Sequence, residues 1–111
     1  MEEIVYDTNE LIDYLKKGNL DLIGFTTVFN VIEFPKALEF NQLSLIYPSI
    51  EDYQESLEIS LALLQKGNPL PAIDILVAAM CIRRNLTLST KDNHFTVIKS
   101  IKKDFKLTLT R

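Results

Sequence analysis

The apolar residues of this chain form short runs, separated by longer stretches in which they recur every three or four positions. The short runs predict strands at residues 4–6, 22–27, 45–47, 86–89 and 107–109. The longer stretches predict helices that begin after Asp7, near Glu33 or Phe34, after Ser49, after Pro71 and at Asp92. Strands separated by helices pair in parallel. The expected fold is therefore a three-layer α/β/α sandwich around a mostly parallel sheet of four or five strands.

Several of these helices carry additional signals. The segment from Asp7 to Glu10 resembles a capping box. Because proline is tolerated only in the first turn of a helix, Pro35 predicts a helix that begins near Glu33, with Glu33 at its N-terminal edge. The helix at 72–84 is apolar nearly all round, which predicts burial on more than one side. The helix after Ser49 has apolar residues at intervals of 3, 4, 4 and 3, namely Ile50, Tyr53, Leu57, Leu61 and Leu64.

Length and composition indicate one globular domain spanning residues 1–111. The chain has 111 residues, of which 47% are apolar and 24% charged. No apolar stretch reaches the roughly 18–20 residues that span a bilayer, and the acidic start Met-Glu-Glu is unlike a signal peptide, so a cytoplasmic location is expected. The single cysteine, Cys81, lies in an apolar helix without a nearby basic partner and is interpreted as a buried thiol rather than a nucleophile.

Charge is distributed unevenly along the chain. Residues 83–111 carry eight basic side chains and two acids, a net charge of +6, which leaves −9 on residues 1–82 because the whole chain has −3. A basic end beside a group of acids suits a polyanion held near metal ions. A solvated helix face with a basic tail explains the same charges, and both interpretations stay open.

Four carboxylates fall where apolar runs give way to helix starts: Asp7, Glu33, Asp74 and Asp92. In an open parallel sheet, ligands bind beyond the carboxyl ends of the strands, where these acids are expected to converge. Each acid is also a plausible helix cap, although Asp74 stands between Ile73 and Ile75 and is harder to explain in that way. Converging carboxylates suit Mg²⁺ or Mn²⁺, and metal ions about 3.5–4 Å apart support phosphodiester hydrolysis. The sequence has no Walker-type loop, GxSxG elbow or HExxH helix.

Four segments, taken together, resemble PIN-domain ribonucleases and among them the compact VapC-type toxins of toxin–antitoxin pairs. The resemblance covers essentially the whole chain. It rests on Val5-Tyr-Asp-Thr-Asn9 with the following Leu-Ile-Asp-Tyr-Leu15, on Glu33, on Pro71-Ala-Ile-Asp-Ile-Leu-Val-Ala-Ala79 and on Leu88-Ser-Thr-Lys-Asp-Asn-His-Phe95.

The resemblance implies an α/β/α sandwich and a metal-dependent endonuclease that acts on RNA. Asp7, Glu33, Asp74 and Asp92 would then be the catalytic acids that hold one or two Mg²⁺ or Mn²⁺ ions. Thr90 would hydrogen-bond a ligand carboxylate or water, and Asn9 would orient Asp7. The resemblance also implies an antitoxin that occupies the groove, and a homodimer.

Two departures from the family pattern stand out. His94 occupies a position that is often acidic in relatives, and the segment between Glu33 and Asp74 is short. His94 is therefore either a contact for phosphate, base or metal, or an exposed residue at a helix start. Arg83, Arg84, Lys91 and Lys99 are candidates for positioning the RNA backbone.

Two other interpretations remain besides the nuclease. One is a PIN-like domain that binds protein or RNA without cleaving it; a phospho-acceptor domain is less favoured, because the first strand is followed by only one acid, Asp7. Packing in the core is favoured for Tyr47 and Tyr53 over stacking on bases.

Overall fold

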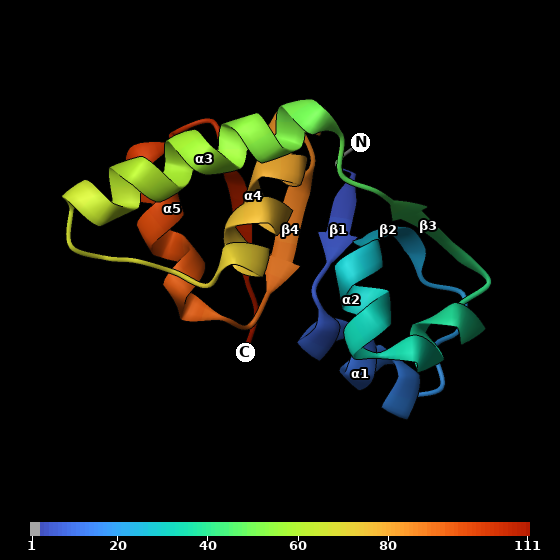
Figure 1. Cartoon of the computed structure of the whole chain (residues 1–111). Helices are drawn as coiled ribbons and strands as arrows, with labels where there is room; N and C mark the ends of the chain where they lie inside the picture. Colours follow the sequence, from blue (N-terminus) through green and yellow to red (C-terminus); the bar gives the residue numbers. More distant parts are fainter. Residues whose placement is uncertain (1–2) are drawn as a thin grey trace.

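Five parallel strands form one sheet in the computed structural model, which describes residues 3–111. The strands are β1 (Ile4–Tyr6), β2 (Ile23–Thr27), β3 (Gln42–Ile46), β4 (Thr87–Thr90) and β5 (Lys106–Leu109). Their order is β3-β2-β1-β4-β5, and every pair of neighbours is parallel (Figure 1). The chain first builds outward from β1 to β3 and then crosses over to β4 and β5, so the topological switch point lies between β1 and β4.

The helices form two groups on either side of the sheet, which confirms the α/β/α sandwich. The first group is α1 (Thr8–Lys16), α2 (Val28–Glu33) and the 3₁₀ helix η1 (Pro35–Glu39); the second is α3 (Ile50–Gln65), α4 (Ala72–Arg84), the 3₁₀ helix η2 (Asn93–Phe95) and α5 (Thr96–Ile101). Figure 1 shows the two groups on opposite sides of β1. Adjacent residues of β1 serve the two sides, because Val5 belongs to the core beneath α3 and α4 whereas Tyr6 packs with Leu11 and Val31.

Burial agrees with the predicted cores of α4 and α5. In α4, residues 75–81 are all buried, including Cys81, and burial raises the pKa of this thiol. Phe95 and Ile98 are also buried, as their spacing predicts. Within residues 3–111, no helix combines the length and the apolar character needed to cross a membrane. The acidic start at Met1 and Glu2 lies outside the described residues.

The start of α1 differs from the predicted capping box. Asp7 is the N-cap, and its Oδ1 accepts a hydrogen bond from the backbone N–H of Thr8 at 2.9 Å. The backbone N–H of Asp7 instead donates to the carbonyl of Ser89 across the sheet. It is therefore not available for the hydrogen bond to the Glu10 side chain that a capping box requires. Glu10 is buried and accepts hydrogen bonds from the hydroxyls of Ser89 (2.5 Å) and Thr110, which ties α1 to β4 and to the end of β5.

The prediction that a helix begins at Glu33 is wrong. Thr27 and Asn30 form a capping box that starts α2 five residues earlier than Glu33, so Glu33 is the last residue of that helix. Phe34, which precedes Pro35, leaves the helical region with φ −139° and ψ 79°. A residue before proline is driven away from helical dihedrals, and Pro35 then occupies the first turn of η1.

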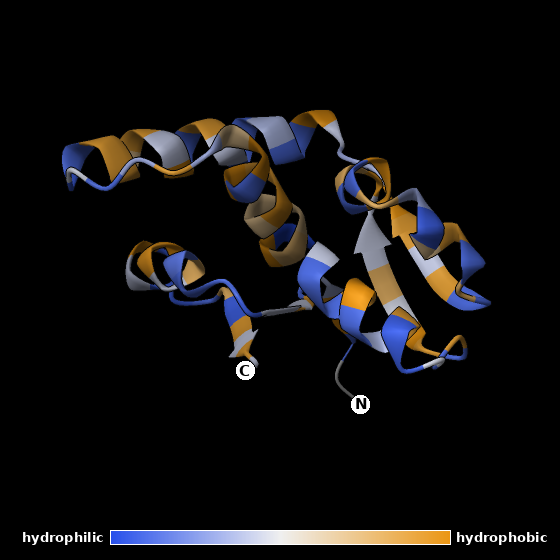
Figure 2. Cartoon of the chain, turned by 90° about the horizontal axis from the view of Figure 1, so that it is seen from below, coloured by the Kyte–Doolittle hydropathy of each residue, from blue (hydrophilic) through white to orange (hydrophobic). Residues whose placement is uncertain are grey.

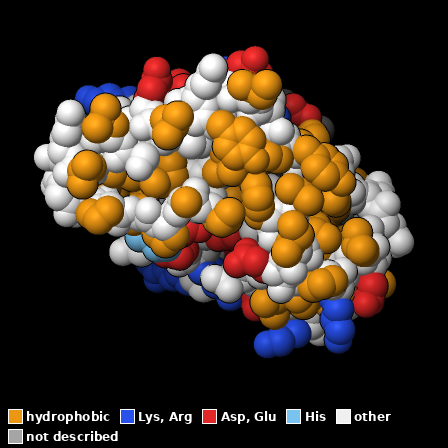
Figure 3. All heavy atoms as spheres, in the orientation of Figure 1, with side chains coloured by type: hydrophobic (Ala, Val, Ile, Leu, Met, Phe, Trp, Pro, Cys, Tyr) orange, Lys and Arg blue, Asp and Glu red, His pale blue; other side chains and the backbone are white. Residues whose placement is uncertain are grey.

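The apolar stripe of α3 faces solvent. Its members Ile50, Tyr53, Leu57, Leu61 and Leu64 are 51–72% exposed, whereas Ile59 and Leu63 on another face of the helix are buried against the core. Figure 2 shows α3 banded apolar and polar along its length, and Figure 3 shows apolar side chains gathered over it. Tyr47 is also exposed, so the prediction that Tyr47 and Tyr53 pack in the core is wrong.

A buried ion pair joins the start of α3 to the end of α4. The carboxylate of Asp52 is fully buried and accepts two hydrogen bonds from Arg84, both at 2.9 Å, while Arg83 Nε lies 3.2 Å away. Asp52 also completes a capping box with Ser49. Burial by itself would raise the pKa of Asp52, but the hydrogen bonds from Arg84 and Ser49 and the charge of Arg84 outweigh it and hold the pKa below its usual value.

Candidate active site

Asp7 lies at the switch point of the sheet, directly after β1, and three donors hold its carboxylate in place. Oδ1 accepts from the Thr8 backbone N–H and from Asn30 Nδ2, each at 2.9 Å, and Oδ2 accepts from Thr90 Oγ1 at 2.6 Å. Thr90 thus makes the hydrogen bond to a carboxylate expected of it. Asn9 is exposed and makes no hydrogen bond to Asp7 within the described residues, so the orienting role predicted for Asn9 belongs to Asn30.

Glu33 is connected to Asp7 through two polar side chains. Thr8 Oγ1 donates to Glu33 Oε1 at 3.0 Å and accepts from Asn30 Nδ2 at 2.9 Å. Asn30 and Glu33 lie three residues apart and therefore share one face of α2. Sequence reasoning missed Thr8 and Asn30; the Thr27–Asn30 capping box was the local signal that would have placed Asn30 at the start of this helix.

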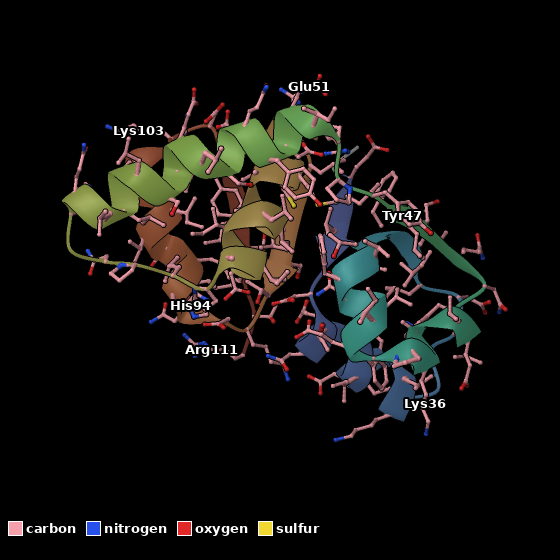
Figure 4. All side chains as sticks on the ribbon, viewed as in Figure 1. Lys36, Tyr47, Glu51, His94, Lys103 and Arg111 are labelled. Carbon is pink, nitrogen blue, oxygen red and sulfur yellow. The ribbon has the colours of Figure 1, made fainter. Side chains whose placement is uncertain are left out.

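Asp74 and Asp92 are bridged by the only histidine of the chain. His94 Nε2 lies 2.8 Å from Asp74 Oδ2, and His94 Nδ1 lies 2.5 Å from Asp92 Oδ1. The imidazole ring stacks on the buried ring of Phe95 with centroids 5.1 Å apart. Figure 4 shows His94 beneath the first turn of α4, the turn that carries Asp74.

The electrostatics of Asp74 show that the acids share one region. Burial raises the pKa of Asp74, the charges of Asp7 and Asp92 raise it further, and the hydrogen bond and charge of His94 offset only part of the rise. Glu33 and Asp74 also line one hollow of about 390 Å³, together with Phe29, Ile32, Pro71 and Ile73. The carboxyl edge of the sheet therefore brings all four predicted acids together.

The donor chemistry of the four acids fits a hard divalent cation. As they stand, no three His, Cys, Asp or Glu side chains in residues 3–111 form a ready metal site. Carboxylate oxygens are nevertheless the ligands that Mg²⁺ and Mn²⁺ prefer, and like charges held this close favour a cation among them. Asp74 and Asp92 each contact the ring of His94.

Comparison with solved structures connects this geometry to known proteins. The chain matches "Crystal structure of VapBC2 from Rickettsia felis bound to a DNA fragment from their promoter" with a TM-score of 0.74 and 20% identity, over 96% of this chain and 97% of that chain. It matches a DNA-bound VapBC from Salmonella typhimurium with a TM-score of 0.75 and 18% identity, over 97% and 98%. A toxin–antitoxin complex from Klebsiella pneumoniae gives a TM-score of 0.60 and 21% identity, over 84% and 90%.

This is the PIN-like fold. The agreement extends over almost the whole of both chains for the first two structures, and it includes the five-stranded parallel sheet whose edge carries the acids. No protein-family model matches the chain, and a comparison with curated protein sequences finds no match. With identities at or below 21%, what the structural matches show is the fold.

On this PIN-like fold, three of the four predicted RNA-binding residues make contacts within the chain. Arg83 and Arg84 pair with Asp52 at the far end of α4 from Asp74, about 15 Å along the helix axis at 1.5 Å per residue. Lys99 Nζ donates to the backbone carbonyls of Lys103 and Phe105. These three side chains are therefore engaged within the protein, and their contact with RNA stays a prediction.

Lys91 remains next to the acids. It precedes Asp92 in the chain and pairs with Asp13 on α1. Asp7 caps the same helix, and the contact of the Lys91 ammonium group with a phosphate stays a prediction.

An apolar groove adjoins the acids on the same fold. A hollow of about 470 Å³ runs between α3 and the start of α4 and is lined by Phe29, Tyr53, Leu57, Ile73 and Leu76, among others. Phe29 and Ile73 also line the hollow that holds Glu33 and Asp74, so the two hollows are continuous. Figure 3 shows acidic side chains directly below this apolar surface.

Proposed function

We propose that the chain is a metal-dependent endoribonuclease and the toxin of a toxin–antitoxin pair. The observation that carries the proposal is the set of four carboxylates at the carboxyl edge of a PIN-like sheet, where burial and the charges of Asp7 and Asp92 raise the pKa of Asp74. Four carboxylates that repel one another lower the stability of the folded chain, and a function in cation binding explains why they are grouped here.

Asp7, Glu33, Asp74 and Asp92 would hold one or two Mg²⁺ or Mn²⁺ ions. Such an ion supplies an activated water and neutralises charge on the phosphodiester when bound. Asn30, Thr8 and Thr90 fix the orientation of Asp7 and Glu33 through the hydrogen bonds described above. Lys91 would bind the phosphate backbone of the RNA beside Asp92.

Metal removal tests the catalytic proposal. Purified protein is expected to cleave single-stranded RNA in Mn²⁺ or Mg²⁺, to lose cleavage in EDTA, and to regain it when Mn²⁺ is restored, as followed by gel electrophoresis of labelled RNA. The alternative function, a PIN-like module that binds RNA or protein without cleaving it, predicts no cleavage under any of these conditions. Cleavage that persists in EDTA would contradict the metal assignment.

The apolar groove supports an antitoxin partner. The structures that the chain resembles are toxin–antitoxin complexes. A segment that fits this groove would present apolar anchors to Phe29, Tyr53 and Ile73 and a basic side chain to Glu33 and Asp74. The net charge of −9 on residues 1–82 favours a basic partner in the same way.

The exposed stripe of α3 supports a homodimer. Its intervals of 3, 4, 4 and 3 read the same in both directions, so an antiparallel α3 from a second copy would present matching apolar residues about a two-fold axis near Leu57. An interface in which each copy offers the same surface requires this self-complementarity. Tyr53 and Leu57 belong to both the stripe and the groove, whereas Leu64 lies outside the groove and Ile73 outside the stripe, so Leu64 and Ile73 distinguish the two partners.

A pair of variants separates these two surfaces. Leu64→Glu is expected to convert a dimer to a monomer, because it places a charge in the two-fold interface, while leaving binding of the antitoxin unchanged. Ile73→Glu is expected to weaken antitoxin binding at least tenfold, because it replaces an apolar contact of the groove with a charged side chain, while leaving the dimer intact. Light scattering after size exclusion, with the product of the neighbouring upstream gene added, measures both. A monomeric wild-type chain would refute the dimer, and equal binding by Ile73→Glu would refute the groove assignment.

A further inference from the structure

We propose that His94 competes with the divalent cation for Asp74 and Asp92. In the structure the imidazole ring lies between these two carboxylates, and a cation that binds both would displace it. The inference rests on the proposed metal-binding function and concerns how that site is regulated by a residue of this chain.

The ring of His94 connects Asp74 to Asp92 by non-covalent contacts. Its two ring nitrogens lie 2.8 Å from Asp74 Oδ2 and 2.5 Å from Asp92 Oδ1, so neither nitrogen is free. Within the described residues, the Asp74 side chain has no other hydrogen-bond partner. Two further contacts fix the position of His94. Its ring stacks on Phe95, and its backbone N–H donates to Asp92 Oδ1 at 3.2 Å.

A cation that binds Asp74 and Asp92 competes with His94 for these carboxylates, because the ring already contacts Asp74 Oδ2 and Asp92 Oδ1. Ligation by Asp74 Oδ2 and Asp92 Oδ1 breaks both contacts to the ring, whichever nitrogen carries the hydrogen. Loss of the hydrogen bond to Asp74 and of the ring contact with Asp92 opposes cation binding. His94 therefore lowers the affinity for metal instead of supplying a ligand, in contrast to an acidic side chain at the same position.

Lys91 provides a matched control because it is a second basic side chain beside Asp92. It pairs with Asp13 and makes no contact with Asp74 or Asp92. Removing Lys91 therefore changes the local charge without removing a contact to Asp74 or Asp92. If charge alone governs cation affinity, Lys91→Ala and a His94 variant will act alike; if the contacts of the His94 ring govern it, they will differ.

The experiment measures Mn²⁺ binding by calorimetry for wild type, His94→Phe, His94→Ala and Lys91→Ala. The Phe variant keeps a ring on Phe95 and loses both nitrogens. His94→Phe and His94→Ala are expected to bind Mn²⁺ about tenfold more tightly, equivalent to about 1.4 kcal/mol, and Lys91→Ala by less than about threefold. Equal or weaker binding by both His94 variants would overturn the inference and leave the proposed function standing. No binding by wild type or by any variant at millimolar Mn²⁺ would overturn both.

A second measurement uses the unaltered protein. Because His94 is the only histidine, its ring gives one set of imidazole ¹⁵N signals. Addition of Mg²⁺ is expected to shift these signals as the ring leaves the two carboxylates, with the same midpoint as the calorimetric binding. Saturation with Mg²⁺ without a change in the ring signals would refute displacement of His94.

Discussion

Replacement of Asp74 by Asn is expected to lower Mn²⁺-dependent RNA cleavage by about a thousandfold. That factor corresponds to about 4 kcal/mol of transition-state stabilisation, within the range that a metal ion supplies to phosphodiester chemistry. Asn keeps the shape of the side chain but removes the charge that would hold the cation. Asp7→Asn is expected to have an effect of the same size, because Asp7 stands at the other side of the switch point. Initial rates of cleavage of a fluorogenic RNA measure both.

Unfolding does not explain the expected loss. The pKa of Asp74 is raised, so the ionised carboxylate costs stability at neutral pH, and that cost grows as pH rises through the folded-state pKa. Asp74→Asn is therefore expected to have a melting temperature at neutral pH equal to or above that of wild type. Asp104→Asn, at an exposed acid before β5, is the matched control and should cleave normally. An Asp74→Asn variant that cleaves at the wild-type rate would remove Asp74 from the catalytic set.

Replacement of Asp52 by Ala is expected to cost about 3 kcal/mol of unfolding free energy, the lower end of the range for breaking a buried ion pair. The change leaves Arg84 without its carboxylate partner and removes the capping box of α3. Arg83 and Arg84 are partly exposed and can be hydrated, which places the effect at the lower end. Urea denaturation measures the loss. Glu51→Ala changes an exposed acid in the same helical turn and should cost well under 1 kcal/mol.

Acid unfolding gives an independent check of Asp52. Because the folded-state pKa of Asp52 is lowered, its contribution is fully present above the unfolded pKa of about 4 and is lost as pH falls through the lower folded value. The stability difference between wild type and Asp52→Asn is therefore expected to be constant from pH 7 to pH 5 and to shrink below about pH 4. A difference that is independent of pH down to pH 2 would contradict the ion-pair explanation.

Local patterns were sufficient to predict the sheet and most of its helices. The strand before Asp7 and the strand before Asp92 are short apolar runs followed by capping residues, and α4 is apolar nearly all round. Since parallel strands end at a common edge, their order along the chain was enough to bring the acids to one region. Glu33 also lies in that region, but at the end of a helix instead of the predicted start. The Thr27–Asn30 capping box begins this helix upstream of Pro35.

Contacts between distant residues were not readable from local patterns. Asn30 reaches Asp7 across 23 positions, Arg84 reaches Asp52 across 32, and His94 reaches Asp74 across 20. The partners of Arg84 and Lys99 were missed for the same reason. The sequence does not distinguish a basic side chain that pairs with a buried carboxylate from one that binds a backbone carbonyl or a phosphate. The amphipathic stripe of α3 shows the same limit: periodicity identified a helix with an apolar face, but packing decided that this face is exposed.

The sequence by itself determined most of the secondary structure, the parallel sheet and the convergence of four carboxylates, because hydrophobic period, capping and strand order act over a few residues or follow from connectivity. Only the tertiary structure decided which side chains hold those carboxylates, that His94 bridges two of them, and that α3 turns its apolar stripe outward. Those outcomes depend on distances between elements far apart in the chain, and the packing of the whole core sets them.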